Sequence, residues 1–178
     1  MSRLWLALLI AASAGLTTAY TCITPFAAFG VIAAMTLSRG HALAATVAVW
    51  LANQVVGFGA LHYPWTAKTF AWGLALGGAA VLATLAARGT ESRSGSLPSL
   101  VRACGAFVAA FAVHQLTLYA AAVFVLGGAG AFAPRIVGQV LLINAVAFVG
   151  LVGLRRLVEA AESFRRRRSA QTSPARFA

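Results

Sequence analysis

Long apolar runs separated by short polar segments dominate the pattern along the chain. A helix needs about 20 predominantly apolar residues to cross a bilayer. The runs predict helices at about residues 3–20, 25–37, 41–61, 66–87, 100–126 and 134–157. We therefore expect an all-α fold: a polytopic membrane helix bundle of about six helices over residues 1–157, followed by a basic cytoplasmic tail over residues 158–178.

The first two predicted helices each leave two interpretations open. The first follows Arg3, and its Ala12-Ser13-Ala14 motif would also suit a cleaved signal peptide, although the apolar pattern continues past that motif. The second, residues 25–37, is too short for a full crossing, so it either tilts within the bundle or enters the membrane and returns. We expect Thr24 to be its N-cap and Pro25 to lie in its first turn.

The composition favours lipid as the surroundings of this chain. Of the 178 residues, 61% are hydrophobic and 10% are charged, whereas soluble domains carry about 25% charged residues. The net charge of +11 would suit a nucleic-acid partner, but no basic-aromatic binding face is visible and we expect no such partner. Seven of the fourteen basic residues lie in the last 24 positions: Arg155, Arg156, Arg165, Arg166, Arg167, Arg168 and Arg176.

Most other basic residues lie between the apolar runs. If all six helices cross, Lys68 and Arg135 alone lie outside, and the remaining arginines lie in the cytoplasm. The excess of Arg over Lys, together with abundant Ala and Gly, is typical of a GC-rich bacterial genome. We therefore expect a multi-pass protein of the bacterial inner membrane with both termini in the cytoplasm. The basic tail is expected to bind anionic membrane lipid.

Polar side chains inside the apolar helices are costly unless they find partners. In the predicted topology they gather in the outer half and the middle of the membrane, where a pocket for a solute would follow. The candidate substrate-binding residues are Asn53, Gln54, His62, Trp65, His114, Gln115, Gln139 and Asn144, with Tyr63 and Trp50 as apolar walls.

Each of these residues also has a structural interpretation. The four amides on helices 41–61 and 134–157 can hold helices together by hydrogen bonds to their neighbours. His114 can be a satisfied interior histidine, and the turn that contains His62 and Trp65 can be an anchor at the membrane interface. Gly73, Gly77 and Gly78 form a small-residue face suited to close helix packing.

Enzyme chemistry finds little support in this sequence. It contains no Asp, and Glu91, Glu159 and Glu162 lie in the predicted cytoplasmic loop or near the C-terminus. No paired carboxylates, HExxH motif or glycine-rich phosphate loop is present. Cys22 and Cys104 are expected to be apolar fillers. We therefore expect no catalytic residues, no metal site and no cofactor.

Three features carry a resemblance to a known family. The first helix has the small-residue ridge Ala7, Ala11 and Gly15, a short helix follows the break at Thr24-Pro25, and the size and loop pattern agree over residues 3–157. The chain thereby resembles the substrate-binding S-components of energy-coupling factor transporters. The resemblance implies that Ala7, Ala11 and Gly15 dock on a coupling transmembrane subunit, that paired cytoplasmic ATPases supply energy, and that a vitamin-like organic solute is held in the outer half.

Metal-transporting members begin with a histidine-bearing N-terminal site, and this chain begins Met-Ser-Arg-Leu, so a metal substrate is not expected. The leading hypothesis is a substrate-capture subunit whose Gly127–Gly130 loop gates the pocket. The alternative is a structural or assembly subunit of a larger membrane complex. A stand-alone channel or transporter has less support, because no charged residue lies in the middle of a predicted helix to couple ions.

Overall fold

The computed structural model describes residues 24–93 and 99–172. These residues form five α-helices: α2 (Phe26–Thr36), α3 (Arg39–Val55), α4 (Ala67–Arg93), α5 (Ser99–Ala121) and α6 (Pro134–Thr172). Single π-helical turns follow α3 and α5, η1 (Val56–Ala60) and η2 (Ala122–Leu126), and a short 3₁₀ helix, η3 (Ala129–Phe132), precedes α6. The described chain is all-helical, as predicted. The first predicted helix, residues 3–20, lies outside the described residues, so the number six is not confirmed.

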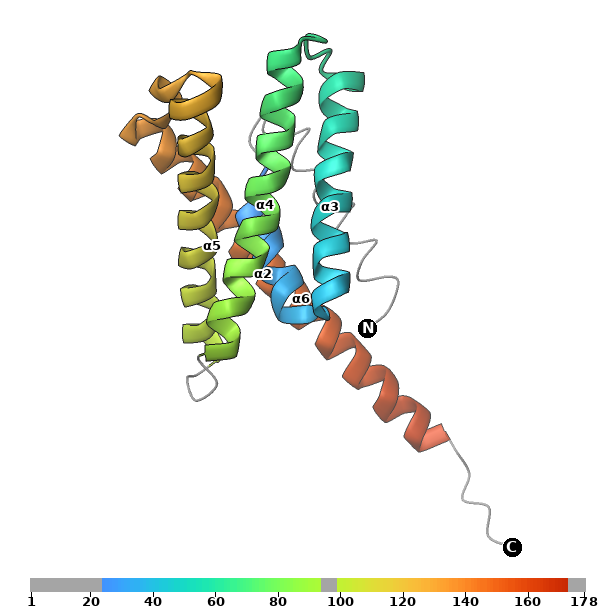
Figure 1. Cartoon of the computed structure of the whole chain (residues 1–178). Helices are drawn as coiled ribbons and strands as arrows, with labels where there is room; N and C mark the ends of the chain where they lie inside the picture. Colours follow the sequence, from blue (N-terminus) through green and yellow to red (C-terminus); the bar gives the residue numbers. More distant parts are fainter. Residues whose placement is uncertain (1–23, 94–98, 173–178) are drawn as a thin grey trace, which may run out of the picture.

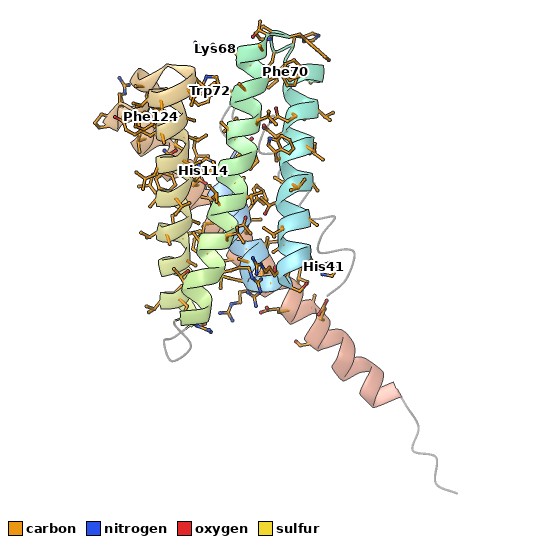
Figure 2. The ribbon with its side chains drawn as sticks, in the orientation of Figure 1. His41, Lys68, Phe70, Trp72, His114 and Phe124 are labelled. Atoms are coloured by element: carbon orange, nitrogen blue, oxygen red, sulfur yellow. The ribbon has the colours of Figure 1, made fainter. Side chains whose placement is uncertain are left out.

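Four helical segments of the described chain are long and apolar enough to cross a membrane: Arg39–Ala60, Ala67–Thr90, Ser99–Leu126 and Pro134–Ser163. Many large apolar side chains of these helices point outward from the bundle (Figure 2). Leu74 is 66% exposed and Phe124 83% exposed. Soluble proteins rarely expose such surface over large patches. Together, length, composition and exposure indicate a membrane protein.

The helices surround the short helix α2. α3, α4 and α5 run in alternating directions beside one another, and α6 crosses obliquely behind them (Figure 1). α2 contacts α3, α4, α5 and α6, and all nine residues from Phe26 to Ala34 are buried. A helix that is apolar on every side is stable only when it is enclosed on every side. α2 is therefore packed within the bundle; whether it crosses the membrane at a tilt or enters and returns depends on residues 1–23, which lie outside the described residues.

Side chains from other helices satisfy both ends of α2. Pro25, and not Thr24, occupies the N-cap position and makes no side-chain cap. The predicted Thr24 cap is wrong, because the N–H of Ala28 in the first turn donates instead to Asn144 Oδ1 of α6 at 3.4 Å. At the other end, Arg88 Nη1 donates to the carbonyl oxygens of Ala34 and Leu37 at 3.0 and 2.8 Å. A cation at a helix C-terminus is also favoured by the helix dipole.

Two helices continue beyond their apolar runs. α4 extends to Arg93 and α6 to Thr172, although the patterns predicted ends at residues 87 and 157. The segment added to α6 is rich in Ala, Glu and Arg, which are strong helix formers, whereas the segment added to α4 also contains Gly89 and Thr90. Arg155 and Glu159 form an i,i+4 ion pair at 2.7 Å at the start of the longer extension. α6 therefore continues past the end of its hydrophobic run in a segment whose residues favour helix.

The basic residues of the described chain divide between the two ends of the bundle. Lys68 lies at one end and His41 at the other (Figure 2). Arg135, at the start of α6, shares the end of Lys68, whereas Arg39 and Arg88 lie near the C-terminus of α2. The helix order thus separates the charges as the predicted crossings require. Which end faces the cytoplasm stays a prediction.

We expect the substitution Arg88→Met to destabilise the bundle by about 2 kcal/mol, since it removes two charge-assisted hydrogen bonds from the end of α2. The melting temperature of the purified protein in detergent measures this effect. Arg39→Met is the matched control, because Arg39 is exposed at the same end of the bundle. Equal melting temperatures for the two variants would contradict the capping role of Arg88.

Candidate functional site

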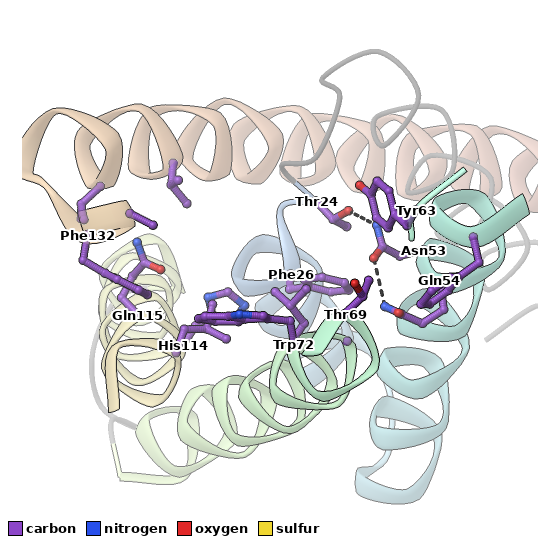
Figure 3. Close-up of a pocket in the computed structure, with 17 residues that line it drawn as sticks. Thr24, Phe26, Asn53, Gln54, Tyr63, Thr69, Trp72, His114, Gln115 and Phe132 are labelled. Carbon is purple, nitrogen blue, oxygen red and sulfur yellow. Dashed lines mark hydrogen bonds between the residues drawn. The ribbon is translucent and has the colours of Figure 1, made fainter. Parts of the chain in front are cut away.

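Three polar side chains form a hydrogen-bonded row between the start of α2 and the end of α3 (Figure 3). Asn53 Nδ2 donates to Thr24 Oγ1 at 2.5 Å, and Gln54 Nε2 donates to Asn53 Oδ1 at 3.3 Å. Oε1 of Gln54 lies against Gly73 of α4, where an added Cβ atom would come within 2.6 Å of it. The two adjacent amides are therefore positioned by each other, by Thr24 and by a glycine on the neighbouring helix.

His114 is a buried polar residue in the middle of α5, only 5% exposed. Its ring lies 6.1 Å from that of Phe26, centroid to centroid, and Figure 3 shows it beside Trp72 of α4. The Nε2 atom of His114 is buried and has no hydrogen-bond partner in the described structure. Leaving such an atom unpaired costs about 1–3 kcal/mol. A hydrogen-bonding ligand in contact with Nε2 would remove this cost.

A cavity of about 240 Å³ extends from the amide row to His114. Its polar lining is Thr24, Asn53, Gln54, Tyr63, Thr69, His114 and Gln115. Its apolar wall is mainly Phe26, Phe58, Trp72, Leu76, Leu118, Phe132, Val137 and Val140. Figure 3 shows Asn53 and Gln54 on one side, Gln115 and Phe132 on the other, and His114 and Trp72 between them. Hydrogen-bonding groups therefore stand at both ends of an aromatic floor.

Irregular backbone at the ends of α3 and α5 completes the cavity. Each helix ends in a π-helical turn, a feature frequent near functional sites. After η2, Gly127 and Gly128 adopt φ values of +74° and +95°, which residues with a Cβ atom rarely reach. This reversal lets η3 place Ala131 and Phe132 in the cavity wall. The Gly127–Gly130 segment therefore adjoins the cavity, and its movement as a gate stays a prediction.

The structure brings together half of the eight predicted binding residues. Those that line the cavity are Asn53, Gln54, His114 and Gln115. Those that do not are His62, Trp65, Gln139 and Asn144. The binding role of the first group stays a prediction, but their shared cavity is now a structural fact.

The residues outside the cavity have other contacts. Trp65 is 76% exposed and packs against Phe58 at 5.5 Å between ring centroids, while His62 and Gln139 are exposed. Asn144 is buried, but its amide is used within the bundle: Nδ2 donates to Val140 O at 3.0 Å and Oδ1 caps α2. Asn144 thus agrees with the interpretation of a helix-joining amide, whereas exposed Gln139 does not, and the interfacial anchor stays a prediction.

Trp50, predicted as an apolar wall, packs instead between α3 and α4. Its Nε1 atom donates to Gly73 O at 2.8 Å, and its ring covers Gly77. The aromatic wall was not predicted from the sequence; it consists of Phe26, Phe58, Trp72 and Phe132. One signal was available for Trp72: together with Thr69, Gly73 and Leu76 it follows the three- and four-residue spacing of one helix face.

None of the described residues that line this cavity is charged, and amides, hydroxyls and an imidazole supply its hydrogen-bonding groups. A charged ligand would lose its hydration here without gaining an opposite charge. The cavity is therefore suited to a small uncharged molecule with donors and acceptors on its edges and a flat apolar face. Within residues 24–93 and 99–172, no group of three or more His, Cys, Asp or Glu residues is placed to hold a metal ion.

The resemblance to S-components was based on the sequence alone. Its docking residues Ala7, Ala11 and Gly15 lie outside the described residues. The geometry of the cavity must therefore support any functional conclusion. Comparisons of the chain with protein-family models, with curated proteins and with solved structures found no match.

Proposed function

We propose that this protein binds a small, uncharged organic solute within the membrane, as the substrate-capture subunit of an uptake system. The observation that carries the proposal is the buried Nε2 of His114, which has no hydrogen-bond partner among the described residues, at a cavity that also presents three amides. A ligand that exchanges a hydrogen bond with Nε2 would remove the cost of that unpaired atom. A cavity of about 240 Å³ is at the small end for ligand sites, which favours a vitamin-sized solute or smaller.

The rest of the uptake system follows from what the chain lacks. Its sequence has no glycine-rich phosphate loop, so transport against a gradient would draw energy from separate cytoplasmic ATPases through a coupling membrane subunit. In the proposed orientation the solute enters from the end that carries Lys68 and Arg135. The cavity lies toward that end, since Tyr63 and Phe132 belong to the turns there.

Two glutamine substitutions test the proposal. The purified protein is screened against a panel of uncharged, water-soluble vitamins and heterocycles by ligand-induced rise in melting temperature, and hits are titrated. We expect Gln115→Leu to weaken binding of a hit by about tenfold, the equivalent of one lost hydrogen bond. Gln139→Leu is the matched control, because Gln139 lies outside the cavity and is exposed.

The screen has two outcomes that count against the proposal. One is that no compound in the panel raises the melting temperature. The other is that Gln115→Leu and Gln139→Leu weaken binding equally, which would place the ligand outside the cavity. A hit that loses affinity only in Gln115→Leu supports the site.

The alternative, a structural or assembly subunit, is favoured by one residue. Asn144 uses both ends of its amide to join α6 to α2 and to its own helix, as a purely structural amide would. Purification in a gentle detergent distinguishes the two functions. A structural subunit retains stoichiometric partners that are not ATPases, whereas recovery as a free monomer contradicts that role.

A further inference from the structure

A second cavity lies at the opposite end of the bundle and takes no part in the proposed function. Its volume is about 290 Å³, and residues of α2, α5 and α6 line it. They are Ile32, Met35, Ser99, Leu100, Arg102, Ala103, Val152, Arg155, Arg156 and Glu159. The described lining of the first cavity has no charged side chain, whereas that of the second has four.

Positive charge is in excess in this second cavity. Arg102, Arg155 and Arg156 face one carboxylate, that of Glu159, which is already paired with Arg155 Nε at 2.7 Å. The Nε atom of Arg102 is buried and has no hydrogen-bond partner in the described structure. A buried guanidinium donor without an acceptor is costly. An anion with several acceptor oxygens would provide acceptors for these guanidinium groups.

The N-terminus of α5 adds to the positive electrostatic potential of the second cavity. Ser99 and Leu100, the first two residues of this 23-residue helix, line the cavity. The first N–H groups of a helix have no partner within it, and the helix dipole adds partial positive charge there. Helix N-termini combined with arginines bind phosphate groups in many proteins.

The remaining lining is mainly apolar and includes one residue that is exposed on the outside of α5, Leu100. Ile32, Met35 and Val152 form one side of the cavity, and Leu100 is 68% exposed beside its charged part. A free phosphate ion would leave these apolar contacts unused. A phospholipid would use both, with its headgroup at the guanidinium groups and its acyl chains along the outside of α5.

We propose that this cavity binds the headgroup phosphate of an anionic phospholipid. Arg102 and Arg156 hold the phosphate, and the start of α5 contributes backbone donors. Basic cavities between membrane helices on the cytoplasmic side are known to suit such headgroups. The site would seat one lipid between α5 and α6 and hold both against α2.

Lipid binding to the full-length protein tests this proposal. The protein is equilibrated in mixed micelles with equal amounts of phosphatidylglycerol and phosphatidylcholine, and bound lipid is counted by native mass spectrometry. We expect retained phosphatidylglycerol to exceed phosphatidylcholine. In Arg102→Gln/Arg156→Gln its affinity should fall about tenfold or more, since two charges contribute.

The control is Arg39→Gln/Arg135→Gln, which removes the same charge from exposed positions outside the cavity. All variants keep the arginines of residues 165–168, so a general effect of the basic tail is constant. Equal melting temperatures in phosphatidylcholine confirm that each variant is folded. A variant that unfolds is replaced by Arg156→Gln alone.

Three results would overturn the proposal. Equal loss of phosphatidylglycerol in both double variants would mean diffuse surface attraction, and equal retention of the two lipids would mean no headgroup selectivity. Inorganic phosphate at millimolar concentration is added in a third arm. If it displaces phosphatidylglycerol completely, the site takes a free anion and the lipid assignment is wrong.

Discussion

Gly30→Ala is expected to destabilise the bundle by about 1–3 kcal/mol, although Ala is the better helix former. Gly30 lies where α2 meets the backbone of α4. An added Cβ atom would stand 2.7 Å from Thr84 Oγ1 and 3.4 Å from both Cα and N of Thr84. Thr84 is fully buried, and its hydroxyl is held by Ala80 O and Thr46 Oγ1 at 2.9 Å each. The hydroxyl has no free direction in which to move, so the helices must separate.

A double-mutant cycle isolates this contact. The free energy of unfolding in mixed detergent is measured for Gly30→Ala in the parent and in a Thr84→Ala background, which lacks the oxygen that the methyl group would meet. We expect the cost of Gly30→Ala to fall by at least about 0.5 kcal/mol in that background. Gly78→Ala is the control, because no atom lies within 4 Å of an added Cβ there. An equal cost in both backgrounds would place the effect elsewhere.

The same glycines show what the sequence could and could not predict about packing. A small-residue face of Gly73, Gly77 and Gly78 was expected. Only Gly73 and Gly77 are at a helix contact, against Gln54 and Trp50, whereas Gly78 meets nothing. Positions four apart share a helix face and adjacent positions differ by about 100°. The glycine content predicted close packing of this helix against a neighbour. Which glycines lie at the contact with α3 is determined by the rotation of α4 about its axis.

The apolar runs predicted each of the described α-helices and the positions at which most of them begin. They did not predict that the shortest, α2, lies at the centre of the bundle. That place follows from its apolarity on every side, together with partners supplied from far along the chain, Asn144 and Arg88, for its two ends. Such long-range partners leave no periodic signal in the sequence.

The sequence predicted which polar residues lie inside apolar helices, where they are costly. It did not predict which of them line one cavity. His114 and Asn144 are indistinguishable by sequence, since each is a polar residue near the middle of an apolar helix. In the structure one has an unpaired nitrogen at a cavity, and the other is hydrogen-bonded at both ends of its amide. The rotation of each helix about its axis determines whether an internal polar group faces another helix or a cavity. In the first case the group joins helices, and in the second it is free to bind a ligand.

Because of this difference, we expect substitution by Leu to change the stability of the protein in opposite directions at His114 and Asn144. We expect His114→Leu to leave the unliganded protein as stable as the parent, or more stable by up to about 2 kcal/mol, because it removes a buried unpaired atom. Asn144→Leu should cost about 1–3 kcal/mol, since it deprives the N–H of Ala28 of its acceptor. Melting temperatures without ligand compare the two variants directly.

For ligand affinity we expect the reverse: a large loss in His114→Leu and little change in Asn144→Leu. A compound that binds the parent should lose about tenfold to a hundredfold in affinity for His114→Leu, because the new side chain offers no hydrogen bond. Its affinity for folded Asn144→Leu should stay within a few-fold of the parent value, since Asn144 does not line the cavity. If His114→Leu instead destabilised the bundle as Asn144→Leu does, His114 would be joining helices. The Nε2 atom of His114 would then not need a bound solute as its hydrogen-bond partner, and the main support for the proposed function would be lost.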